Sequence, residues 1–173
     1  MEKRAIALGF FDGIHLGHQA LLARTVERSR ERGLEPAVLT FDRWPKPGQA
    51  QLLTTTEERV RIIQALFPIE TVLVVPFDEG VRTMDWRDFM DLLAGEYRAG
   101  WLVAGHDFRF GYKGLGDAEK LRQRAAELGL GCDIIPAVTG ADGRVVSSTE
   151  IRERLAAGDT DGAQRLLGHR LLP

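Results

Sequence analysis

The chain has 173 residues, of which 44% are hydrophobic and 28% charged, and its formal net charge is −2. This composition predicts one soluble domain over residues 1–173 with its own hydrophobic core, and so small a charge gives no electrostatic basis for binding nucleic acid or an anionic membrane. Asp12 interrupts the N-terminal apolar stretch, no apolar run approaches a membrane span, and a single cysteine leaves no internal disulfide. We therefore expect a cytoplasmic protein without a signal peptide.

The first half of the chain predicts strands and helices in alternation. We place the strands at 5–8, 36–41 and 71–75 and the helices at 16–32 and 55–66. Gly33 ends the first helix, and Thr55 opens the second with a capping box. Residues 42–51, with two prolines and a glycine, predict an exposed loop. The β-branched run at 71–75 is typical of a strand covered on both faces.

The second half repeats this alternation. We place a helix between Asp85 and Gly100, a strand at 101–104, a polar loop at 105–116, a helix at 117–128, a strand at 133–138, a turn at 142–143, a helix from Ser147 to Gly158 and a short helix at 161–167. Such alternation implies right-handed crossovers, and therefore an α/β, Rossmann-like parallel sheet flanked by helices. Loops at the carboxyl ends of its strands should converge on one edge and bind the ligand. Because no GxGxxG follows the first strand and no GK[ST] occurs, the usual dinucleotide fold and the P-loop are disfavoured.

The turn between the first strand and the first helix contains two histidines. His15 and His18 lie three residues apart at the start of the helix, and hence on one face. A helix N-terminus stabilises anions, phosphate above all, so these imidazoles and the free amides suit a phosphate whose charge grows in a transition state. Two ordinary surface histidines explain the spacing equally well. A zinc site needs a third ligand, but His106 and His169 lie far off and Cys132 is the only cysteine.

These residues also carry a resemblance to a known family. His15-Leu16-Gly17-His18 resembles the HxGH signature of the nucleotidyltransferase superfamily. The longer string 11–19 is similar to the FMN adenylyltransferase (FAD synthetase) module of bacterial bifunctional riboflavin kinase/FMN adenylyltransferases. Residues 146–152 are similar to the SSTxIR element of the superfamily, which binds triphosphate. Read from its residues alone, this segment is either a second phosphate cradle or only a well-capped helix.

Two further segments match the same family. Residues 105–113 resemble its DFRFG loop, where aromatic rings suit a flat heterocycle. Residues 39–45 match its T-F-D/E-P-H-P segment, except that Arg43 replaces proline and Trp44 replaces histidine. Phe10 stands where asparagine is common. The resemblance covers about 5–168 and stops where the relatives continue into a riboflavin kinase domain, so we expect no riboflavin kinase activity.

The resemblance implies transfer of AMP from ATP to FMN, giving FAD and pyrophosphate by in-line attack, with Mg²⁺ held mainly by the substrate phosphates and no protein metal site. It implies that the catalytic residues are His15, His18 and Arg152. The implied nucleotide-binding residues are Gly9, Phe10, Phe11, Asp12, Gly13, Gly105, Asp107, Ser147, Ser148 and Thr149. The implied flavin-binding residues are Phe41, Asp42, Arg43, Trp44, Phe108, Arg109, Phe110 and Lys113.

Two alternatives stay open. The same superfamily uses other phosphorylated acceptors, namely pantetheine phosphate, nicotinate mononucleotide and glycerol phosphate, although the aromatic loop at 105–113 argues against them. The second alternative is a flavin-binding module with little catalysis. Its marks are Arg43, which would pair with the FMN phosphate, and Trp44, which would stack on the flavin.

Overall fold

The computed structural model describes residues 2–48 and 51–171. The strands of its sheet are β1 (Arg4–Leu8), β2 (Glu35–Phe41), β3 (Thr71–Val75), β4 (Ala99–Gly105) and β5 (Gly131–Ile135). All pair in parallel, in the order β3-β2-β1-β4-β5, which confirms the predicted α/β fold. The chain builds from β1 outward to β3 and then returns to add β4 on the other side of β1. Sheets of this class bind ligands beyond the carboxyl ends of the strands that flank such a reversal, here β1 and β4.

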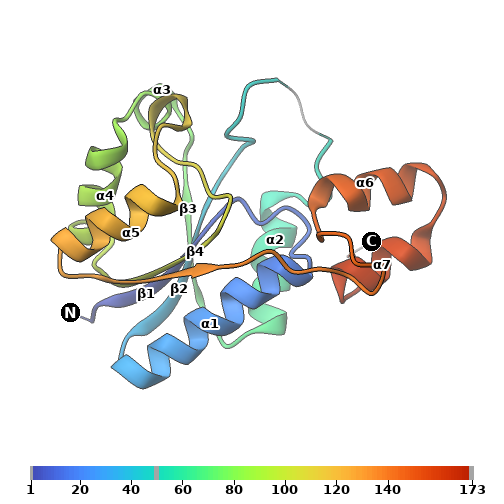
Figure 1. Cartoon of the computed structure of the whole chain (residues 1–173), viewed down its shortest axis with the longest axis horizontal. Helices are drawn as coiled ribbons and strands as arrows, with labels where there is room; N and C mark the ends of the chain where they lie inside the picture. Colours follow the sequence, from blue (N-terminus) through green and yellow to red (C-terminus); the bar gives the residue numbers. More distant parts are fainter. Residues whose placement is uncertain (1, 49–50, 172–173) are drawn as a thin grey trace.

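Helices cover both faces of the sheet. They are α1 (Leu16–Arg32), α2 (Thr56–Leu66), α3 (Glu79–Arg82), α4 (Trp86–Ala94), α5 (Ala118–Glu127), α6 (Ser148–Ala156) and α7 (Thr160–Leu167), with a 3₁₀ turn η1 (Tyr112–Gly114). The cores place α1 and α2 on one face and α4 and α5 on the other. The last two helices pack on each other at one end of the molecule, beside the start of α1 (Figure 1). They therefore stand where a strand-end site is expected.

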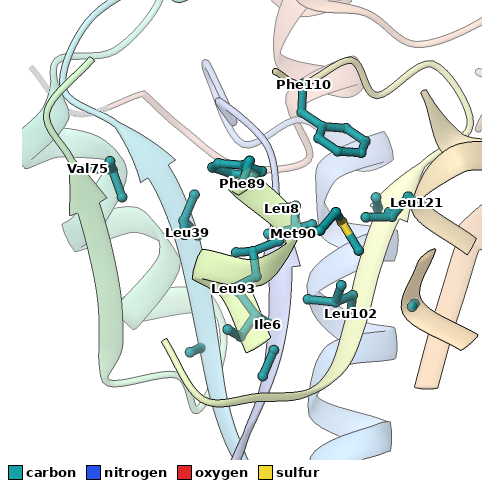
Figure 2. Close-up of a cluster of buried hydrophobic side chains, with 14 of the residues drawn as sticks. Ile6, Leu8, Leu39, Val75, Phe89, Met90, Leu93, Leu102, Phe110 and Leu121 are labelled. Atoms are coloured by element: carbon teal, nitrogen blue, oxygen red, sulfur yellow. The ribbon is translucent and has the colours of Figure 1, made fainter. Parts of the chain in front are cut away.

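The larger core lies between the sheet and α4. Figure 2 shows Phe89, Met90 and Leu93 of α4 directed at Leu8 and Leu39 of the sheet. All five side chains are at most 3% exposed. Burying a side chain of this size stabilises the fold by about 1.5–3 kcal/mol. This face is therefore a rigid support for the loops at the strand ends.

Of two predictions about the strands, one is confirmed and one was wrong. The strand β3 lies at the edge of the sheet, yet it is packed on both faces, as predicted: Val72 lies against the core with α1 and α2, and Leu73 and Val75 lie against the core with α4. Val74 is 36% exposed, so the cover is incomplete at this position. The strand β5 spans Gly131–Ile135 instead of 133–138, because Pro136 has no N–H to donate to the ladder.

Two short elements were not predicted at all. The helix α3 is a single turn, capped by the Asp78 side chain, which accepts a hydrogen bond from the Val81 N–H at 2.9 Å. The turn η1 has three residues. Neither is long enough for a helical period to show in the sequence. The turn predicted at 142–143 is confirmed by an antiparallel bridge between Thr139 and Val145.

Candidate active site

The turn between β1 and α1 has strained backbone. Gly13 has a φ of 86°, but Phe11 and Ile14 also have positive φ, at 61° and 51°. This conformation is unfavourable for a β-branched residue and costs on the order of 1–3 kcal/mol. Both side chains are buried, at 1% and 0% exposure, so the core fixes the turn in place. Strain of this kind is concentrated at functional sites.

His15 and His18 cap the helix reciprocally. His15 is the N-cap of α1, and its Nδ1 accepts a hydrogen bond from the His18 N–H at 3.2 Å. The Nδ1 of His18 accepts one from the His15 N–H at 3.3 Å. The two rings stack with centroids 3.5 Å apart and planes 14° apart. Gly17 lies between them, where a Cβ would come within 2.8 Å of the His15 ring.

This pairing fixes the chemical state of both rings. Since each Nδ1 is an acceptor, a neutral ring carries its proton on Nε2. Burial lowers the pKa of His15 to about 4, although the charges of Asp107 and Asp12 act in the opposite direction. Burial, with a contribution from His15, also lowers the pKa of His18 well below 6.5. Near pH 7 both side chains are therefore neutral Nε2–H donors, which suits an anion beside a helix N-terminus.

The carboxylate of Asp12 fastens the turn to two distant segments. It is 3% exposed and accepts hydrogen bonds from the Leu53 N–H, the Thr54 N–H and the Thr54 hydroxyl, all at 3.0 Å. Its Oδ2 forms an ion pair with Arg152 at 2.8 Å. These donors occupy the acceptor capacity of the carboxylate. Asp12 therefore holds the site together and is not available as a ligand.

The start of α6 lies against the same turn. The Ser147 side chain accepts a hydrogen bond from the Glu150 N–H at 3.1 Å, as expected for an N-cap. The hydroxyl of Ser148 donates to the Asp12 carbonyl at 2.8 Å, while Thr149 is exposed. The two segments with predicted phosphate-binding residues, 136 residues apart at this contact, are therefore neighbours in space.

The aromatic residues at positions 10 and 44 lie together. Phe10 and Trp44 pack edge to face with centroids 5.3 Å apart. The guanidinium of Arg152 lies 5.8 Å from the Trp44 ring centroid. Arg43, in contrast, is exposed and forms an ion pair with its neighbour Asp42 at 3.1 Å. Phe10 and Trp44, two of the three residues that depart from the motif described above, are thus in direct contact.

The loop after β4 divides between core and surface. Phe110 is 6% exposed and belongs to the core, at the top of the cluster in Figure 2. The half-exposed Phe108 stacks on it, with centroids 5.5 Å apart and planes at 15°. Phe110 therefore supports Phe108 from below instead of facing a ligand. Lys113 contacts the Tyr112 ring and does not join the histidines through any contact in the described residues.

A hollow of about 450 Å³ lies beside this loop. Its lining includes Asp107 and Arg109, and it extends to the first turn of α5. Among the other strand-end segments, the turn at 9–13 contacts Trp44 through Phe10 and Ser148 through the Asp12 carbonyl. The predicted convergence is confirmed by direct contact for these three segments.

Two further residues, His169 and Arg59, belong to this region and were not predicted from the sequence. His169 was placed far from the histidine pair, but its Nε2 lies 2.8 Å from the Gly13 carbonyl oxygen. Its Nε2 faces backbone carbonyls, and no three His, Cys, Asp or Glu side chains in residues 2–48 and 51–171 are arranged to hold a metal ion. Arg59 is 1% exposed and donates to the Phe41 carbonyl at 2.7 Å. Neither contact leaves a local signal in the sequence.

The family model and the curated relatives agree on one family. The family described as FAD synthetase matches residues 1–150. The putative bifunctional riboflavin kinase/FMN adenylyltransferase of Geobacillus thermodenitrificans is 36% identical over 166 residues, covering 94% of this chain and 88% of that protein. The bifunctional riboflavin kinase/FMN adenylyltransferase of Escherichia coli K12 is also 36% identical, over 97% of this chain and 55% of its own length. The corresponding Pseudomonas fluorescens protein is 34% identical, and 53% of it is covered.

The chain thus spans about half the length of several of the curated relatives it matches. A solved structure described as a macrolide-efflux protein from Streptococcus pneumoniae superimposes with a TM-score of 0.85 at 27% identity, covering 99% of this chain and 57% of that one. Within the described residues, no helix has the length and apolar character needed to cross a membrane. On the family match and the Geobacillus relative together, the chain belongs to the FAD synthetase family.

Proposed function

We propose that this chain is an FMN adenylyltransferase, which forms FAD and pyrophosphate from ATP and FMN. The observation that carries the proposal is the contact between two anion-binding elements. The neutral pair His15 and His18 begins α1, and Ser148 and Arg152 bring α6 against the same turn. A triphosphate needs donors on more than one side, and this arrangement supplies them.

The reaction requires positioning more than proton transfer. An oxygen of the FMN phosphate attacks the α-phosphorus of ATP, and the bond to the oxygen that bridges the α- and β-phosphorus breaks, so pyrophosphate leaves. A phosphate monoester has its second pKa near 6, so near pH 7 the nucleophile needs no general base. The Nε2–H groups of His15 and His18 would hold α- and β-phosphate oxygens as charge builds on them.

The α6 segment would hold the leaving group. Ser147, Ser148 and Thr149 stand at a helix N-terminus, where amides and hydroxyls bind phosphate. Arg152 gives an Nη2 hydrogen to Asp12, which orients the guanidinium, and its other N–H donors serve pyrophosphate. This assignment keeps the role proposed for Arg152 but makes Asp12 its support.

Mg²⁺ enters this proposal as part of the substrate. The carboxylate of Asp12 is occupied by four donor groups, and the described residues present no cluster of metal ligands. We therefore propose that the ion arrives as the ATP complex, held by phosphate oxygens and water, as Mg²⁺ commonly is in nucleotide sites. A cytoplasmic location, where ATP and FMN are both present, belongs to the same proposal.

We place the acceptor end on the aromatic side of the site. Phe108 and the pair of Phe10 and Trp44 offer ring faces and edges to an isoalloxazine. Phe41 is 8% exposed, belongs to the core and packs edge to face on Phe77, so it supports this side without presenting a ring face. Asp107 and Arg109 line the adjoining hollow, which we assign to the nucleotide.

The test is direct. Purified protein is incubated with FMN, ATP and Mg²⁺, and the products are separated by chromatography. We expect FAD and pyrophosphate in equal amounts, and no product from pantetheine phosphate, nicotinate mononucleotide or glycerol phosphate. FMN binding that quenches tryptophan fluorescence without FAD formation would instead identify a binding module, and an absence of FMN binding would point to another acceptor.

A further inference from the structure

Arg59 of α2 is a buried arginine next to the candidate site. It is 1% exposed, and its Nη2 donates to the Phe41 carbonyl at 2.7 Å and to the Thr56 hydroxyl at 3.3 Å. Its Nε is buried without a hydrogen-bond partner in the described part of the chain. A buried polar group left in this state is costly, so the fold retains Arg59 against a penalty.

Its charge also lacks a direct ion-pair partner. Among the residues that the structure describes, no carboxylate lies within the 4.0 Å that defines an ion pair with Arg59. Asp12, Glu57 and Asp42 act on the guanidinium only from farther away, and burial lowers the pKa of Arg59 in spite of them. The buried carboxylate of Asp12 is itself paired with Arg152, so Arg59 carries a buried positive charge that no carboxylate contacts.

The position of Arg59 links this charge to the site. Its guanidinium carbon lies 4.3 Å from the Phe10 ring centroid, in a cation–π contact. Phe10 packs on Trp44, and Trp44 lies under Arg152. Arg59 and Arg152 therefore contact the two ends of one aromatic pair, Phe10 and Trp44.

We propose that Arg59 is a positioning residue whose buried charge, which no carboxylate contacts, supports the binding of substrate anions from behind the site. The bound triphosphate or acceptor phosphate adds negative charge near this guanidinium. This inference rests on the proposed function only for the identity of the anions. It predicts that removing the charge of Arg59 lowers the affinity for anions and leaves the affinity for neutral ligands unchanged.

The experiment compares three variants. Arg59→Gln keeps a donor for the Phe41 carbonyl but removes the charge, and Arg59→Lys keeps the charge. Arg61→Gln removes the same charge from an exposed position two residues along the same helix, which makes it the matched control. Pyrophosphate binding is measured by calorimetry, and FMN and riboflavin binding by fluorescence quenching.

We expect Arg59→Gln to weaken pyrophosphate and FMN binding by roughly tenfold, the effect of one charge about 10 Å away at an effective dielectric constant near 20. Riboflavin, which lacks the phosphate, should bind as it does to the wild type. Arg59→Lys should restore most of the anion affinity, and Arg61→Gln should change none of it.

Three results would overturn this inference: unchanged pyrophosphate affinity in Arg59→Gln, an equal loss in Arg61→Gln, or a wild type that does not bind pyrophosphate. If Arg59→Gln does not fold, Arg59→Lys decides the question. A tenfold loss of pyrophosphate affinity in the folded Arg59→Lys, which keeps the positive charge, would show that the charge is not what supports anion binding. The FAD assay on the wild type is independent of these measurements, so failure of the proposed function is distinguishable from failure of the role of Arg59.

Discussion

Each histidine of the pair uses its two nitrogens for different purposes. The Nδ1 atoms cap α1, and the Nε2–H groups are the donors that we propose for phosphate. His15→Asn separates these roles, because asparagine is a favoured N-cap but carries no donor at the position of Nε2. We expect its thermal midpoint to stay near that of the wild type while FAD formation falls by about 10² to 10³. His15→Ala, which loses both roles, should also unfold at lower temperature. Near-wild-type turnover in a folded His15→Asn would refute the assignment.

The same pair predicts the pH dependence of stability. An unfolded histidine binds a proton below pH 6.5, whereas folded His15 resists protonation down to about pH 4. The unfolded state therefore holds more protons in this window, and the free energy of unfolding falls as pH decreases from 6.5 towards 4. The slope is at most about 1.4 kcal/mol per pH unit for each histidine. Urea unfolding at pH 7.5, 6.5 and 5.5 measures it. His15→Asn should show a shallower slope, and parallel curves for both proteins would contradict the proposed state of His15.

At the scale of elements, the first turn of α1 contains Gly17, a residue of low helix propensity that leaves room for the stacked rings of His15 and His18. Alanine at position 17 would normally stabilise a helix by about 1 kcal/mol relative to glycine. Here its Cβ would lie 2.8 Å from the His15 ring, so that ring must move and the stack with His18 must open. We expect Gly17→Ala to fold but to lose at least about tenfold in FAD formation, since small displacements of catalytic groups are costly. Gly80→Ala serves as a control for expression and assay, because this exposed glycine of α3 has no positive φ and its added Cβ would lie 3.4 Å from the nearest atom, Asp78 Oδ1.

The ends of the helices were predictable because the residues that cap them are close to them in the sequence. The caps by Thr55, Ser147 and Gly33 lie within one turn of the helices they limit, and the sequence shows them directly. The parallel-sheet rule also predicted that the strand-end loops meet. The edge position of β3 was not predictable, because the strand order depends on the whole chain. The error at β5 came from overlooking Pro136.

The contents of the site were only partly predictable. The HxGH turn and the start of α6 were identified by resemblance, and their contact followed from the fold. The role of Asp12 as the common support of residues 53–54 and Arg152 did not follow, since its partners lie 41 to 140 residues away. Arg59 and His169 bind backbone carbonyls 18 and 156 residues away and so have no pattern of their own.

At the scale of the whole molecule, the site joins both ends of the chain. β1 and α1 come from the N-terminal part, and α6 comes from the C-terminal part, with Asp12 and Arg152 forming the contact between them. A triphosphate bound to both should therefore stabilise the fold as a unit. At a ligand concentration of 100 times its dissociation constant, the gain is about 2.7 kcal/mol. Thermal unfolding with and without MgATP measures this gain as a rise in the midpoint.

Two variants distinguish a change in the stability of the fold from a change in its stabilisation by MgATP. Arg152→Met removes a proposed triphosphate donor and leaves Asp12 without its ion pair, so both the midpoint and its rise with MgATP should decrease. Leu93→Ala lies in the core against the sheet, far from any proposed ligand contact, and should cost about 2–5 kcal/mol. Its midpoint should fall, yet MgATP should raise that midpoint by nearly the same free energy as in the wild type. If Arg152→Met retained the full rise while Leu93→Ala lost it, the bridging of the two chain ends by the nucleotide would be wrong.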